Sequence, residues 1–89
     1  MPRQIHWTTE WNNHIQLIDG NVRNVSWQEF QHPRDTGSWF AIVYYRELEY
    51  GRGSSATLSD AKDAASQVAM KTMCPEKHDA IIDRASRKD

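Results

Sequence analysis

Few side chains in this sequence of 89 residues are placed to do covalent chemistry. The four histidines and the single cysteine, Cys74, show none of the spacings of a metal site. Glu47 and Glu49 fall on one face of a predicted strand, which is more typical of a solvated edge than of a paired acid and base. No serine stands in the context of a nucleophile elbow. We therefore expect a protein that is not an enzyme and that needs no metal or cofactor.

The remaining polar side chains are suited to recognition by hydrogen bonding and charge. Asn12, Asn13 and Gln16 fall on the polar side of a predicted helix, and each side-chain amide can both donate and accept hydrogen bonds. A second group of polar side chains lies within the stretch "YGRGSSATLSDAK", which contains Arg52 and Lys62. Because the net charge is −1, any polyanionic partner must be bound through a local basic face.

The first element that positions these side chains is a helix near the N-terminus. Trp7, Trp11, Ile15 and Ile18 recur at spacings of four, four and three residues, which is the period of one helix face. Gly20 follows as the predicted left-handed terminator. The face that carries the tryptophans should be buried, and the amides should face solvent.

Three strands and a second helix follow. "VSWQEF" (25–30), "WFAIVYY" (39–45) and "ELEY" (47–50) are predicted strands. "QHPRDTGS" is a predicted loop and "GRGSSA" a predicted turn. The second predicted helix covers 58–73, with Thr57 and Asp60 in capping-box positions and Pro75 as its stop.

These elements predict an α+β fold in the order α-β-β-β-α. A three-stranded antiparallel sheet with two helices packed on one face is a stable two-layer arrangement. We expect one domain over 1–74, followed by a polar tail over 75–89 that is a frayed helix or disordered.

The chain resembles the double-stranded RNA-binding domain family over residues from about 7 to 74. The C-terminal half of that family usually reads Y-G-x-G-x-G-x-S-K-K-x-A-K-x-A-A, and its first helix often reads L-N-E-Y-x-Q. Trp27 and Phe40 match the aromatic positions of its first two strands. The residues that match the C-terminal motif, or replace parts of it, are Tyr50, Gly51, Gly53, Ser55, Thr57, Leu58, Ser59, Ala61, Lys62, Ala64 and Ala65, with Met70 and Met73 at two leucine positions.

The resemblance implies shape-based binding of double-stranded RNA through three surfaces that span ~16 base pairs. It implies no small-molecule cofactor and no membrane partner. By position, the first surface would hold Asn12, Asn13 and Gln16, the second His32 and Arg34, and the third Arg52, Ser59 and Lys62.

The third surface departs from the family in charge. Leu58 and Ser59 replace two lysines, and Asp60 and Asp63 flank the lysine that remains, Lys62. Each phosphate that a protein neutralises adds nearly one unit to the salt dependence of binding. The loss of two of the three main contacts should therefore lower both the affinity and that salt dependence, and we expect weak RNA binding.

The alternative hypothesis is a protein-interaction or homodimerisation module that uses an exposed sheet face. In the second strand Phe40, Ile42 and Tyr44 alternate with Trp39, Ala41, Val43 and Tyr45. If the helices cover the first set, Trp39, Val43 and Tyr45 would form an exposed apolar strip for a partner protein or a second copy.

The expected compartment is intracellular, in the cytoplasm or the nucleus. A single cysteine allows no internal disulfide. The N-terminal residues "MPRQIHWTTEW" contain no apolar run of a secretory signal, and the chain has no membrane-span candidate.

Overall fold

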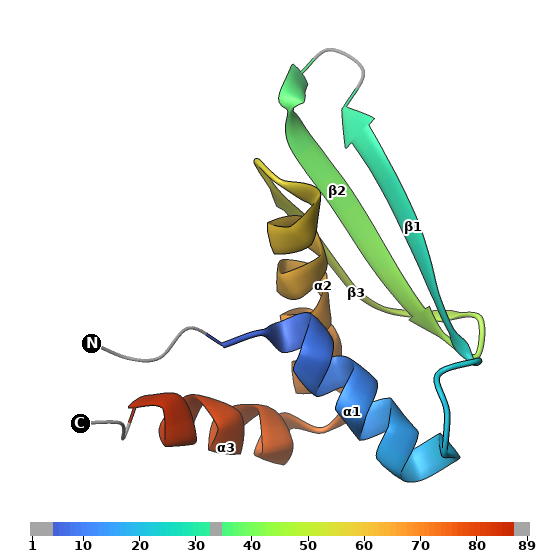
Figure 1. The fold of residues 1–89 in the computed structure, drawn as a ribbon, viewed down its shortest axis with the longest axis vertical. Coiled ribbons are helices and arrows are strands. Elements are labelled where there is room, and N and C mark those ends of the chain that lie inside the picture. Colours follow the sequence, from blue (N-terminus) through green and yellow to red (C-terminus); the bar gives the residue numbers. More distant parts are fainter. Residues whose placement is uncertain (1–4, 33–34, 87–89) are drawn as a thin grey trace.

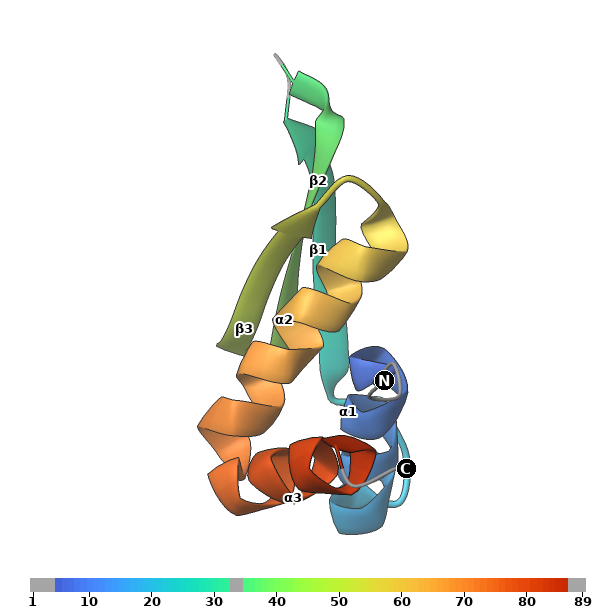
Figure 2. The ribbon, with the colours of Figure 1, turned by 90° about the vertical axis from the view of Figure 1, so that its left-hand side faces the viewer.

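The computed structural model describes residues 5–32 and 35–86. Its elements are α1 (Trp7–Asp19), β1 (Val25–His32), β2 (Asp35–Tyr45), β3 (Leu48–Ser55), α2 (Leu58–Met73) and α3 (Pro75–Ser86) (Figure 1). The strands form one antiparallel sheet in the order β1-β2-β3. The helices lie on one side of this sheet (Figure 2). The predicted α-β-β-β-α order and the α+β class are confirmed. None of the described helices is long and apolar enough to cross a membrane.

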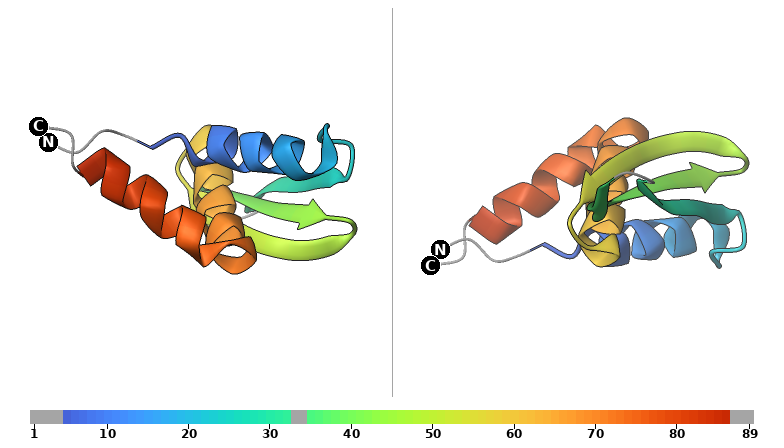
Figure 3. Two further views of the ribbon diagram at one scale, coloured as in Figure 1. Left: turned by 90° about the horizontal axis from the view of Figure 1, so that it is seen from below. Right: turned by 90° about the horizontal axis from the view of Figure 1, so that it is seen from above.

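Helix α1 buries the face that its sequence period predicts. Trp7, Trp11 and Ile15 are buried, and Gly20 ends the helix in the left-handed conformation, with its amide donating to the carbonyl oxygen of Gln16. Ile18 departs from the prediction, because 52% of its surface is exposed. It lies in the last turn of α1, which extends past α2 and α3 (Figure 3), so no helix covers it.

Strand β3 continues through the glycines that were predicted to form a turn. A Cβ atom on Gly51 would overlap the backbone oxygen of Ala65, and one on Gly53 would lie 2.6 Å from the amide nitrogen of Ala65. Both glycines therefore face α2 and allow its backbone to lie directly on the strand. The turn prediction for "GRGSSA" is wrong. Glycines that allow a helix to pack closely on a strand cannot be distinguished from turn glycines by the local sequence.

Helix α2 begins and ends as predicted. Thr57 is its N-cap, and the Thr57 hydroxyl accepts a hydrogen bond of 3.2 Å from the amide of Asp60. At the other end, the Cys74 amide donates to the carbonyl oxygen of Met70. Pro75 then opens α3 at the first helical position, where its missing amide proton costs least.

The segment after Cys74 is a packed helix and not the expected frayed or disordered tail. In α3, His78, Ile81 and Ala85 are buried, and their spacing of three and four residues makes one helix face. Ile81 belongs to the main core, and the His78 ring stacks on Trp7 with ring centroids 5.0 Å apart. The folded unit therefore extends at least to Ser86, beyond the predicted boundary at residue 74.

The helices cover the opposite face of β2 from the one assumed in the protein-interaction hypothesis. Val43 is fully buried and Tyr45 is 8% exposed, both in the core, and Trp39 packs partly buried against it. These three residues are therefore not an exposed strip, and that assignment is wrong. Apolar residues occupy both faces of β2, so alternation alone could not identify the covered one.

Small residues decide which face the helices cover. Across the sheet, Ala41 pairs with Gly53, and Val43 pairs with Gly51. This face lets α2 approach the sheet closely, since Gly51 and Gly53 carry no side chains that would hold the helix away from β3. The face without helices consequently carries Phe40, Ile42 and Tyr44, of which Ile42 is only 9% exposed and the other two are half-buried. It is called the open face below.

Candidate nucleic-acid interface

The outer face of α1 presents a row of polar side chains. Asn13 and Gln16 are exposed, and Asn12 is half-buried. Thr9, also exposed, lies one turn before Asn13 on the same side of the helix. This row is where the sequence placed the first RNA-binding surface.

Asp63 of α2 fixes the start of this row. Its carboxylate accepts a hydrogen bond of 3.0 Å from the Thr8 amide and one of 2.6 Å from the Thr8 hydroxyl. The Thr8 amide is one of the first amides of α1, which have no partner within the helix, so Asp63 caps α1 from a neighbouring element. Ser66 adds a longer contact of 3.4 Å to the Thr8 hydroxyl. The sequence indicated only that Asp63 lowers the charge near Lys62.

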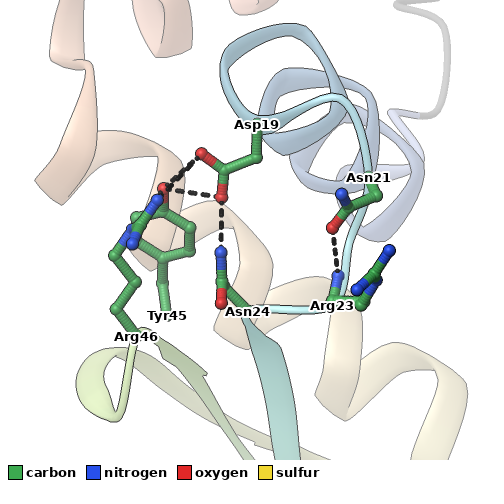
Figure 4. Close-up of polar contacts among 6 residues, drawn as sticks. All are labelled: Asp19, Asn21, Arg23, Asn24, Tyr45 and Arg46. Carbon is green, nitrogen blue, oxygen red and sulfur yellow. Dashed lines mark hydrogen bonds and ion pairs between the residues drawn. The ribbon is translucent and has the colours of Figure 1, made fainter.

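A network at the other end of α1 fixes its orientation (Figure 4). The Tyr45 hydroxyl donates to the Asp19 carboxylate at 2.9 Å, and the Asn24 amide donates to it at 3.0 Å. Arg46 forms an ion pair with the same carboxylate at 3.3 Å. Hydrogen bonds lower the pKa of Asp19; the bond from Asn24 has the largest effect and the bond from Tyr45 the next largest.

This network also holds an unusual turn between β2 and β3. Arg46 and Glu47 have φ angles of 52° and 70°. Two successive positive φ values are typical of a tight hairpin turn that usually contains Asn-Gly. Neither residue adopts that conformation readily. The contacts of Arg46 with Asp19 and with the Tyr45 hydroxyl compensate for it.

A hollow of about 420 Å³ lies between the starts of α1 and α2. Ser59 and Lys62 line it from α2, and Thr9 and His6 line it from the N-terminal side of α1. Thr9 thus connects the amide row on α1 to the start of α2. His6 and Thr9 were not predicted as site residues. The sequence signal that could have identified them is their position, since His6 directly precedes α1 and Thr9 lies in its first turn.

Lys62, the remaining lysine of the motif, is turned toward β1. Its ammonium nitrogen lies 3.2 Å from a carboxylate oxygen of Glu29 and 4.8 Å from the centre of the Trp27 ring. The Lys62 side chain is 30% exposed and that of Glu29 is 34% exposed. The charge of Lys62 is therefore already compensated within the domain.

Arg52 lies on the opposite side of the molecule from the other predicted residues. It follows Gly51 and precedes Gly53, both of which face α2, so its side chain points to the open face of the sheet. There it forms two hydrogen bonds of 2.7 Å with Glu49, and this contact lowers the pKa of Glu49. Arg52 therefore does not lie beside Ser59 and Lys62, and the structure does not bring together the three residues predicted for the third surface. That grouping relied on the glycine segment being a turn.

The second predicted surface is at the β1–β2 connection. Strands β1 and β2 continue beyond the helices to this end of the domain (Figure 1). The domain measures 41 Å along its longest axis. The side chain of His32 and the whole of Arg34 lie outside the described residues.

Comparisons with known proteins assign no family. No family model matches the chain, and no curated protein matches it. Among the described residues, no group of three or more His, Cys, Asp or Glu side chains could hold a metal ion.

Proposed function

We propose that the domain binds double-stranded RNA by shape, through the side of the molecule formed by α1 and the start of α2. The observation that carries this proposal is the continuous polar surface from Gln16 and Asn13 through Thr9 to Ser59. The end of the β1–β2 hairpin lies further along the same long axis (Figure 1). A linear series of contact points is what a duplex with repeating minor grooves requires.

The side chains on this surface match the chemistry of an RNA minor groove. A-form RNA exposes 2′-hydroxyls and base edges in a wide, shallow minor groove. The amides of Asn13 and Gln16 both donate and accept hydrogen bonds, as a 2′-hydroxyl does. The contacts of α1 with Asp63 at one end and with Tyr45 at the other hold the helix that carries both amides in a fixed orientation, so binding need not order the helix backbone.

Electrostatic attraction contributes little to this proposal. Lys62 is paired with Glu29, and Arg52 points to the other face of the sheet. With few phosphate contacts, the affinity should be low and its logarithm should fall only slowly with the logarithm of the salt concentration. An RNA partner would place the protein in the cytoplasm or the nucleus.

A duplex titration tests the proposal. A duplex RNA of about 16 base pairs should bind saturably at low salt, and a DNA duplex of the same sequence should bind more weakly or not at all. Gln16→Ala should weaken RNA binding. Gln28→Ala, which removes an amide from the open sheet face, is the matched control and should leave RNA binding unchanged. Equal binding of RNA and DNA, or equal effects of both variants, would contradict the proposal.

The open face of the sheet favours a second candidate function, docking of a second copy of this chain. Phe30 is 42% exposed and stacks on Phe40 with ring centroids 5.3 Å apart. Beside them is a hollow of about 220 Å³ that Ile42, Arg52 and Ser54 also line. Glu49 pairs with Arg52 next to this apolar centre. A face that carries an apolar centre and both charges can be complementary to itself, as a two-fold interface requires.

Light scattering during size-exclusion chromatography tests the second function. The wild-type chain should show a dimer at high concentration, and Phe30→Asp should shift it to a monomer. Leu17→Asp is the control, since Leu17 is 75% exposed on α1, away from the sheet. A clean monomer of the wild-type chain at high concentration would exclude self-association.

A further inference from the structure

The contacts of Lys62 place a carboxylate where a phosphate of the partner would have to bind. The Lys62 ammonium lies between Glu29, at 3.2 Å, and the Trp27 ring, at 4.8 Å. An ammonium has three donors and no acceptor, and a carboxylate and a phosphate offer it the same kind of charged oxygen. The ring holds the cation without neutralising it.

This ion pair is weak enough to be displaced. Both side chains are about one-third exposed, at 30% and 34%, and partly exposed ion pairs contribute only about 1.4- to 5-fold to an equilibrium. Lys62 also lines the hollow at the start of α2 with Ser59. A phosphate at that hollow would therefore compete directly with Glu29 for the same ammonium group.

We infer that Glu29 is an intramolecular competitor that limits RNA affinity by occupying Lys62, an inference that rests on the RNA-binding function proposed above. Glu29 sets how many phosphates the domain engages without touching the RNA itself. Removing its charge leaves Lys62 beside Trp27 but free to bind a phosphate. Glu29 is thus an affinity-determining residue on β1 that acts through a residue on α2.

Two measured quantities should change in Glu29→Gln. The affinity for duplex RNA at low salt should rise by about 1.4- to 5-fold, because that is the factor by which a partly exposed ion pair stabilises the competing contact of Lys62 with Glu29. The plot of the logarithm of the binding constant against the logarithm of salt concentration should steepen by about 0.9, the value for one additional phosphate contact. A purely structural role of the pair, such as protecting the edge of β1, would not change this slope.

The experiment compares Glu29→Gln with Glu49→Gln. Both substitutions raise the net charge by one, and both release a cation, but Glu49 releases Arg52 on the open sheet face. Only Glu29→Gln should raise the affinity and steepen the slope. In a Lys62→Gln background, Glu29→Gln should have no effect, because the double-mutant cycle isolates the coupling between the two residues. Circular dichroism of each variant confirms that it is folded.

The possible results separate this inference from the proposed function. An equal gain in both glutamate variants, or a gain that persists with Lys62→Gln, would show a general charge effect and overturn the inference. RNA binding that is weakened by Gln16→Ala but unchanged by Glu29→Gln would overturn the inference alone. Absence of RNA binding by the wild-type chain and by Glu29→Gln at low salt would overturn both.

Discussion

Replacing Gly51 with alanine should destabilise the domain severely, although the change adds a single methyl group. The new Cβ would overlap the backbone oxygen of Ala65 and lie 2.7 Å from the amide nitrogen of Ala69. Both neighbours are backbone atoms of α2, so no side-chain rotation relieves the overlap. The whole helix would have to move away from β3 and would lose packing along the core.

The magnitude follows from the cost of overpacking. Insertion of a methyl group into a packed core costs about 1–3 kcal/mol, and a fixed backbone on the far side places Gly51→Ala at about 3 kcal/mol or more. The whole domain is expected to have only about 5–15 kcal/mol of unfolding free energy. In urea, a loss of this size should lower the unfolding midpoint by about 1 M or more.

Gly20→Ala is the matched control for this substitution. Gly20 has a φ of 79°, and no atom lies within 4 Å of the position that a Cβ would take there. Its cost should be limited to left-handed strain, about 1–2 kcal/mol. Urea unfolding followed by circular dichroism measures both variants. If Gly51→Ala costs less than Gly20→Ala, then β3 does not lie against α2 as described, and the explanation given for the glycines is wrong.

Three further predictions concern the network at Asp19, helix α3 and the start of α2. Hydrogen bonds lower the pKa of Asp19 below its ordinary value of 3.8, so its stabilising effect is present above that pH and is lost as pH falls through the lower, folded-state value. Urea unfolding between about pH 5 and pH 2 should therefore show a smaller loss of stability in Asp19→Asn than in the wild type. Ile81→Ala should cost about 2–5 kcal/mol of unfolding free energy, whereas Ile82→Ala, at a site 37% exposed, should cost far less; equal costs would mean that α3 is not packed on the core. Replacing both Leu58 and Ser59 with lysine should steepen the salt dependence of RNA binding by up to about 1.8, and an unchanged slope would mean that the start of α2 does not face the RNA.

Local patterns were sufficient to predict most elements of the fold. The spacing of Trp7, Trp11 and Ile15 identified the buried face of α1, and Thr57 and Pro75 marked the limits of α2. Each of these signals depends on neighbours within one or two helical turns. The order of these elements, with the stability of a two-layer arrangement, then predicted a three-stranded antiparallel sheet with helices on one face, which the structure confirms.

The errors concern features that depend on contacts between distant segments. The glycines of β3 were interpreted as a turn because their contact with α2 spans more than ten residues of sequence. Arg52 was misplaced for the same reason. Apolar residues on both faces of β2 left the covered face undetermined, so Val43 was assigned to the surface although it is fully buried. His78 and Ile81 lie in a polar segment that is recognisable as a packed helix only when its partners in the core are known.

The junction between β3 and α2 has a structural role that does not depend on the proposed binding role. Gly51 and Gly53 let α2 lie on the sheet, Thr57 starts the helix, and Asp63 caps α1. None of these functions needs a lysine, so the fold does not depend on a basic cluster at this junction. Under the proposed function, RNA affinity and fold stability would therefore depend on largely different residues of this segment. Lys62 connects the two properties. Its ammonium group contacts Glu29 and Trp27 of β1, and an RNA phosphate would have to displace Glu29 to bind the same group.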